Sequence, residues 1–121
     1  MFSLASDLRF SLYLEATDMR KSFNGLSGLV TNELKRDPRS GEVFLFVNKR
    51  RDRVKLLRYV SGSFVLYYKR LEKGTFELPS YDIKTGSITL KYTQLVLLID
   101  GLSIKNISKR KTYAQAPVKA G

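Results

Sequence analysis

The sequence predicts an α+β fold in which one amphipathic helix packs across a face of an antiparallel sheet, with a second short helix near the C-terminus. Three observations support this fold class. Apolar residues recur at helical spacing over residues 18–34, and a continuous apolar run covers residues 43–47. Apolar stretches also flank a short basic segment, residues 48–53, which is typical of a β-hairpin with a charged tip.

Chain length and charge limit the possible organisation. With 121 residues, 43% of them hydrophobic, the chain suits one compact domain, which we place at residues 1–104. Residues 105–121 hold few apolar side chains and are expected to form a flexible basic tail. Twenty-two Lys and Arg against eleven Asp and Glu give a net charge of +11. This excess favours an acidic polymer as partner, and the alternative is a solvated basic surface with no specific partner.

The residue types that are missing exclude several kinds of chemistry. The chain has no Cys and no His, which excludes disulfides, thiol nucleophiles, His-based catalysis and the usual zinc sites. It also lacks a phosphate-binding glycine motif, so we expect no cofactor and no metal. The N-terminal segment does not resemble a signal peptide, and no window approaches the ~18 apolar residues of a membrane span. We therefore expect a cytoplasmic protein that does not bind membranes.

Two regions outside the hairpin are expected to contribute strands. Apolar side chains alternate over residues 10–15 and predict the first strand. Residues 87–89 are expected to form a short strand or an extended piece. The apolar residues that follow have helical spacing and predict the second helix over residues 91–100.

The long helix is predicted over residues 18–34, with Thr17 as its N-cap and Asp18 in its first turn. Gly25 and Gly28 lie inside it, and each costs up to about 1 kcal/mol relative to Ala in a helix interior. Close approach of the helix to the sheet is the favoured explanation, and close approach to the backbone of a ligand is the alternative. The apolar stripe of this helix consists of Met19, Phe23, Leu26, Val30 and Leu34.

The central strands follow a loop at residues 35–41. Residues 43–47 are expected to form a strand buried on both faces, because they are continuously apolar and rich in β-branched and aromatic types. The basic tip comes next, and its return strand at residues 54–59 leads into a third strand at residues 64–71. The predicted core consists of Phe23, Leu26, Val30, Phe44, Phe46, Leu56, Val65 and Tyr67.

The hairpin and the strand after it carry the candidate nucleic-acid-binding residues. Their long cationic side chains can contact phosphates, which positions a protein on DNA without reading its sequence. Tyr67 and Tyr68 precede two of these cations and could stack on unpaired bases, although tyrosines in strands are more commonly half-buried sheet residues. The candidates are Lys49, Arg50, Arg51, Arg53, Lys55, Arg58, Lys69, Arg70 and Lys73.

Residues 17–30, 43–58 and 64–76 resemble the TnpB-type accessory protein of the insertion-sequence-sixty-six family of bacterial transposable elements. The resemblance covers residues 1–79. It implies an accessory factor that helps to move the element and is encoded beside a separate transposase. Ser22 and Asn24 stand where many relatives have Gly and Asp. If the acidic residue at position 24 took part in chemistry in those relatives, its replacement by Asn24 argues against catalysis by this chain.

Three functions remain in competition at this point. The first is a non-catalytic DNA-binding factor that acts through the basic hairpin during transposition. The second is a protein-interaction module that docks on the transposase through residues 64–68, with the hairpin as a charged rim. The third, a metal-dependent nuclease, is disfavoured because the acidic residues are scattered over predicted caps, turns and loops.

Overall fold

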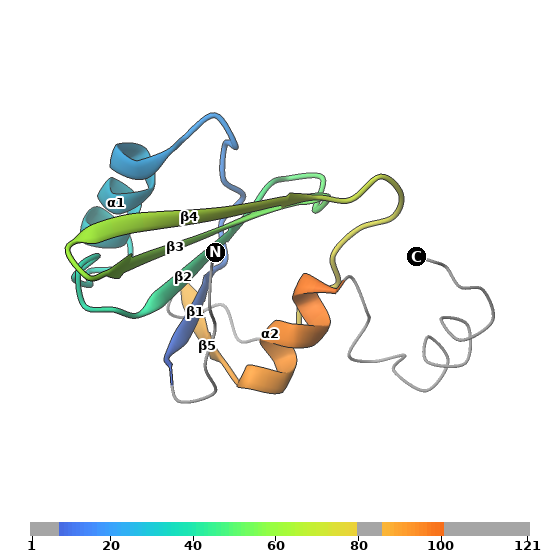
Figure 1. The fold of residues 1–121 in the computed structure, drawn as a ribbon. Coiled ribbons are helices and arrows are strands. Elements are labelled where there is room, and N and C mark those ends of the chain that lie inside the picture. The colour runs from blue at the N-terminus through green and yellow to red at the C-terminus, as the bar shows by residue number, and fades with distance from the viewer. Residues whose placement is uncertain (1–7, 80–85, 101–121) are drawn as a thin grey trace.

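The computed structural model describes residues 8–79 and 86–100, which form five strands and two helices (Figure 1). This arrangement confirms the α+β fold with a second short helix near the C-terminus. The predicted tail at residues 105–121 lies outside the described residues. The elements are β1 (Phe10–Tyr13), α1 (Phe23–Asn32), β2 (Val43–Val47), β3 (Arg53–Val60), β4 (Ser63–Arg70), β5 (Ser87–Leu90) and α2 (Tyr92–Ile99).

The strands form one mostly antiparallel sheet in the order β4-β3-β2-β1-β5. β2, β3 and β4 make the predicted meander, and β3 joins β4 through a two-residue turn in which Ser61 and Gly62 have φ angles of 52° and 79°. The exception to the antiparallel pattern is β1, which runs parallel to β2 with Phe10 opposite Val43. α1 lies between these two strands in the chain and supplies the long crossover that parallel neighbours require.

The sheet is covered on both faces. On one face, Leu26 and Val30 of α1 pack in a cluster with Phe44, Phe46 and Leu57. All five residues of β2 are buried, which confirms the prediction for this strand. The cluster on the other face joins α2 to the sheet and contains Phe10, Leu12, Val43, Leu45, Val47, Val54, Leu56, Phe76, Leu90, Leu95 and Leu98.

The start of α1 differs from the prediction. Thr17 is not the N-cap, because its backbone N–H donates to the Val47 carbonyl at 2.9 Å and keeps the chain beside the sheet. Asp18 then accepts the backbone N–H of Arg20 at 2.9 Å and closes a local turn. The helix therefore begins five residues later than predicted, at Phe23. Residues 14–22 form the connection between β1 and α1.

This shift also changes the predicted core. Leu26, Val30, Phe44, Phe46 and Leu56 are fully buried, as predicted. Val65 and Tyr67 are half-buried on the edge strand β4. The prediction for Phe23 is wrong. This residue is 43% exposed, because it is the first residue of the helix and the buried stripe begins only at Leu26.

The two glycines of α1 do not bring it closer to the sheet. A Cβ atom at Gly25 would lie 3.1 Å from the Cβ and Cγ atoms of Lys21, in the connection that precedes the helix. At Gly28 the nearest atom would be the side-chain nitrogen of Asn32, at 4.0 Å. The expected close approach of helix to sheet is therefore wrong, and Gly25 instead accommodates the turn into the helix.

Candidate nucleic-acid interface

Asn48 organises the tip of the β2–β3 hairpin into a closed turn. Its side-chain carbonyl accepts the backbone N–H groups of Asp52 and Arg53, each at 3.0 Å. Its side-chain amide donates to the Asp52 carboxylate at 2.7 Å. The backbone N–H of Arg51 donates to the backbone carbonyl of Asn48 at 3.0 Å, and Arg51 adopts a φ angle of 59°. These bonds give the cations of the tip a defined backbone from which to project.

The hydrogen bond from Asn48 also lowers the pKa of Asp52, and the positive charges of Arg50 and Arg53 lower it further. The carboxylate therefore stays ionised at neutral pH and remains tied to the turn. Its charge is directed toward Asn48, while Lys49, Arg50 and Arg51 are exposed. The tip consequently presents mainly positive charge to solvent.

The segment that follows β4 folds back onto this tip. The backbone N–H of Leu71 donates to the Asp52 carbonyl at 2.8 Å, and that of Phe76 donates to the Arg51 carbonyl at 2.6 Å. Phe76 is buried in the core, so the return is anchored at both ends. Lys73 lies exposed in the loop between these two anchors. The structure thus brings Lys73 to the tip, more than twenty residues along the chain from Asn48.

Two arginines face each other beside the tip. Arg53 and Arg70 are directly opposite in the antiparallel register of β3 and β4, so their side chains leave the same face of the sheet. Like charges in this position destabilise a sheet. Glu72 lies 3.5 Å from Arg70, but this ion pair is exposed and contributes little. An arrangement with this cost is expected where an external anion binds.

The cations that the structure gathers at this end of the sheet are referred to below as the tip surface. Its members are Lys49, Arg50, Arg51, Arg53, Arg70 and Lys73.

A cleft of about 380 Å³ separates the tip from the connection that precedes α1. Its cationic lining consists of Lys49, Arg50 and Arg53 together with Arg20, which the sequence analysis missed. No sequence pattern linked Arg20 to the hairpin, because the two segments are about thirty residues apart in the chain. The parallel pairing of β1 and β2 brings the chain after β1 beside the chain after β2.

Asp18 binds Arg20 at the border of this cleft, where the Arg20 side chain is 91% exposed. Its guanidinium group donates to both carboxylate oxygens, at 2.7–3.1 Å. These hydrogen bonds lower the pKa of Asp18 to about 2, with a further contribution from the backbone N–H of Arg20. Both side chains are therefore ionised at neutral pH, and Asp18 partly neutralises this side of the cleft.

Lys55 does not belong to the tip surface. It is 6% exposed, and its ammonium group donates to the backbone carbonyls of Met19 and Lys21, both at 2.7 Å. The same nitrogen lies 4.7 Å from the centroid of the Tyr68 ring. Lys55 thus joins β3 to the connection before α1, and in this structure its charge is not available to a phosphate.

Arg58 and Lys69 also lie apart from the tip. The Lys69 ammonium group donates to the backbone carbonyl of Ile99, at the C-terminal end of α2, where a positive charge is favourable. Arg58 lies toward the opposite end of β3, five residues beyond Arg53. The structure therefore brings six of the nine candidate residues together and separates the other three.

The two candidate stacking residues have different environments. Tyr67 packs against the core on the α2 face, whereas the Tyr68 residue is 49% exposed. Tyr68 lies opposite Lys55 on the face that carries Arg53 and Arg70. Of this pair, only Tyr68 is exposed beside the tip surface, and the Lys55 ammonium group lies over one face of its ring.

Comparisons with known proteins identify the family. A family model described as "IS66 Orf2 like protein" matches residues 8–109. The chain belongs to the IS66 Orf2-like family. This membership confirms the resemblance recognised in the sequence. It identifies the chain as an accessory protein associated with transposition.

Two relatives from Sinorhizobium fredii (strain NBRC 101917 / NGR234) support the assignment. "Uncharacterized protein y4jC" is 30% identical over 110 residues, which cover 91% of this chain and 92% of the relative. "Uncharacterized protein y4hO" is 33% identical over 86 residues, which cover 71% and 73%. No solved structure matches the IS66 Orf2-like chain significantly.

Two features are absent from the part of the chain that the structure describes, namely a cluster of metal ligands and a helix that could span a membrane. Within residues 8–79 and 86–100, no group of three or more Asp, Glu, Cys or His side chains could hold a metal ion. Within the same ranges, neither helix is long and apolar enough to cross a membrane.

Proposed function

We propose that this chain is a non-catalytic DNA-binding accessory factor of transposition, which contacts DNA phosphates through the tip surface. The observation that carries the proposal is the pairing of Arg53 and Arg70 across β3 and β4, next to the exposed tip. Six cations against Asp52 and Glu72 make this end of the sheet a strong source of positive potential. The family assignment provides the context of transposition.

Phosphate contact is the mode of recognition that these side chains suit. Arg donates bidentately to phosphate oxygens, and Lys acts as a mobile point charge. Such contacts fix the position of a protein on DNA but do not read its bases. We therefore propose that the tip surface binds DNA of many sequences, and that selection of the ends of the element depends on the transposase.

Binding of the purified chain to random-sequence duplex DNA at several salt concentrations tests the proposal. If about six phosphates are neutralised, log affinity should fall against log salt with a slope near −5, at about −0.9 per phosphate. An affinity that does not depend on salt would contradict the proposal, and so would the absence of binding at low salt.

The alternative is a module that docks on the transposase without contacting DNA. The observation that favours it is the sheet edge formed by β4, where the exposed Tyr68 stands near Arg70. Tyr and Arg are both enriched at protein interfaces. The two functions can be separated by co-purification with the transposase of the same element after nuclease treatment. An association bridged by DNA is lost after this treatment, whereas direct docking persists.

A further inference from the structure

A second cationic surface lies at the opposite end of the sheet from the tip. There, a hollow of about 610 Å³ is bordered by the start of β1, the loop before β2, and the turn between β3 and β4. We refer to it as the arginine hollow, because Arg9, Arg39 and Arg58 line it. Figure 1 shows the β3–β4 turn and the β2–β3 tip at opposite ends of the long hairpin. Arg58 was a candidate DNA-binding residue in the sequence, but the proposed function, which acts through the tip surface, does not use this hollow.

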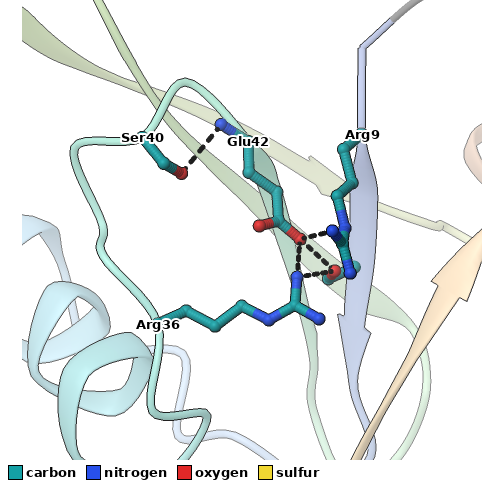
Figure 2. Close-up of polar contacts among 5 residues, drawn as sticks. Arg9, Arg36, Ser40 and Glu42 are labelled. Atoms are coloured by element: carbon teal, nitrogen blue, oxygen red, sulfur yellow. Dashed lines mark hydrogen bonds and ion pairs between the residues drawn. The ribbon is translucent and has the colours of Figure 1, made fainter.

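Glu42 anchors the wall of the arginine hollow (Figure 2). Its side chain is 8% exposed, and its carboxylate accepts hydrogen bonds from the Arg36 guanidinium group and the Ser11 hydroxyl group. The Nε atom of Arg9 lies 3.4 Å from the same carboxylate oxygen, yet the Arg9 side chain remains 57% exposed. One carboxylate thus serves two guanidinium groups, and Arg9 can still reach an external anion.

Arg39 is positioned differently, by aromatic rings. Its guanidinium carbon lies 5.7 Å from the ring centroid of Tyr59 and 5.5 Å from that of Phe64. Cation–π contacts of this kind position a guanidinium group without using its N–H groups, which can then donate to phosphate oxygens. Arg39 is exposed, so this preoriented group faces solvent. The hollow therefore combines a salt-bridged wall with an oriented, accessible arginine.

We propose that the arginine hollow binds the phosphates of a second DNA segment, so that one chain bridges two segments. The inference rests on the proposed binding of a first segment by the tip surface. Arg58 leaves the opposite face of the sheet from Arg53, because the two are five residues apart on β3. Arg39 lies on the face of Arg53, since Tyr59, which it contacts, is six residues from Arg53. The hollow is therefore separated from the tip surface mainly by distance along the strands. β3 spans eight residues, or roughly 25 Å at about 3.3 Å per residue. A duplex that crosses the strands at the tip surface would therefore leave the hollow at the other end of the hairpin free for a second segment.

Energy transfer between two short duplexes, one with a donor dye and one with an acceptor dye, measures bridging directly. As wild-type protein is added, the transfer signal should first rise, because one chain holds two duplexes. It should fall again at excess protein, because each duplex then binds a separate chain. The variant R9Q/R39Q should bind a single duplex with nearly the wild-type salt slope and lose most of the transfer signal. The variant K49Q/R50Q removes the same charge from the tip surface and should instead weaken single-duplex binding.

The single variant R39Q controls for a loss of folding in R9Q/R39Q. Arg9 contacts the buried Glu42, so its replacement could disturb the fold, whereas Arg39 is exposed. R39Q should have an unchanged melting temperature. The slope of log affinity against log salt for binding of the second duplex should become smaller by nearly one unit. Wild-type protein that binds one duplex but never bridges two would overturn this inference and leave the proposed function intact. Unchanged bridging by R39Q and R9Q/R39Q would also overturn it, because two tips of a dimer would then hold the duplexes. Wild-type protein that binds no duplex would contradict both proposals.

Discussion

Lys55 carries its charge inside the protein, although it belongs to the most basic segment of the sequence. Its ammonium group satisfies two backbone carbonyls that would otherwise lose a partner, and it contacts the face of an aromatic ring. Position in the sequence could not reveal this role, because both carbonyls belong to a segment more than thirty residues away. A long cationic side chain next to an exposed tip has the same local pattern whether it binds phosphate or closes the fold.

Replacement of Lys55 by Met should lower stability and leave DNA binding largely unchanged. The substitution removes two hydrogen bonds from a charged donor and leaves the carbonyls of Met19 and Lys21 without it, at a cost of about 1–3 kcal/mol. Urea denaturation measures the change in the free energy of unfolding. Lys49→Met is the matched control, because Lys49 is exposed and its loss should shift stability by less than about 0.5 kcal/mol. A K55M protein of wild-type stability with a reduced salt slope would instead place Lys55 on the DNA.

Arg20 controls the ionisation of Asp18. Because the pKa of Asp18 is lowered to about 2 in the folded protein, the stabilisation from this pair is complete above the ordinary value of 3.8. It is lost as the pH falls through the folded pKa. Arg20→Gln removes the side-chain hydrogen bonds, which are the largest cause, so the pKa of Asp18 should rise toward 3.8.

The carboxyl-carbon NMR shift of Asp18, followed against pH, measures this change. Lys21→Gln is the control, because Lys21 makes only the smallest of the contributions to the lowered pKa. A midpoint that stays near 2 in the R20Q protein would show that the Asp18–Arg20 pair is not formed in solution.

At the scale of elements, α1 shows how tertiary contacts can override a helical pattern. Apolar spacing and a plausible cap predicted a start at residue 18, whereas the helix begins at Phe23. The hydrogen bond from Thr17 to Val47 holds the chain against the sheet, and the carbonyls of Met19 and Lys21 turn toward Lys55. These long-range bonds leave no trace in a local window. The buried part of the stripe, Leu26 and Val30, was nevertheless predictable from the spacing alone.

Truncations at two positions of α1 should therefore differ. Leu26→Ala should cost about 2–5 kcal/mol, because Leu26 is fully buried and its removal leaves a cavity. Phe23→Ala should cost only about 1 kcal/mol, because this residue is 43% exposed and has less apolar area to lose. Thermal or urea denaturation of the two variants measures the difference. Equal losses of about 3–5 kcal/mol would show that Phe23 is buried, as the helical pattern alone would suggest.

For the whole molecule, the sequence was sufficient to predict the meander, both helices and the doubly buried β2. Each of these features depends on a local period or a local turn. The parallel pairing of β1 with β2 was not predictable from local patterns, because it depends on how the crossover through α1 returns to the sheet. The arginine hollow was missed for the same reason: Arg9, Arg39 and Arg58 come from three segments that only the folded sheet brings together.

The candidate site was predicted in part. The exposed tip residues follow one another in the chain, so their clustering could be read from the sequence. The contribution of Lys73 depends on the hydrogen bonds that fold residues 71–76 back onto the tip. The facing pair of Arg53 and Arg70 depends on the register of β3 and β4. A register of this kind is set by the whole sheet and by the length of the turn.

The central claim is that the tip surface binds DNA through phosphates, and the variant R50Q/R51Q/R53Q tests it most directly. Gln keeps a long polar side chain at each position, so the melting temperature should stay close to that of the wild type. Log affinity for random-sequence DNA against log salt should change from a slope near −5 to about −2, roughly one unit per lost contact. Lys35→Gln, which removes an exposed cation outside both surfaces, should leave the slope unchanged. A folded triple variant that binds DNA with the wild-type slope would contradict the claim.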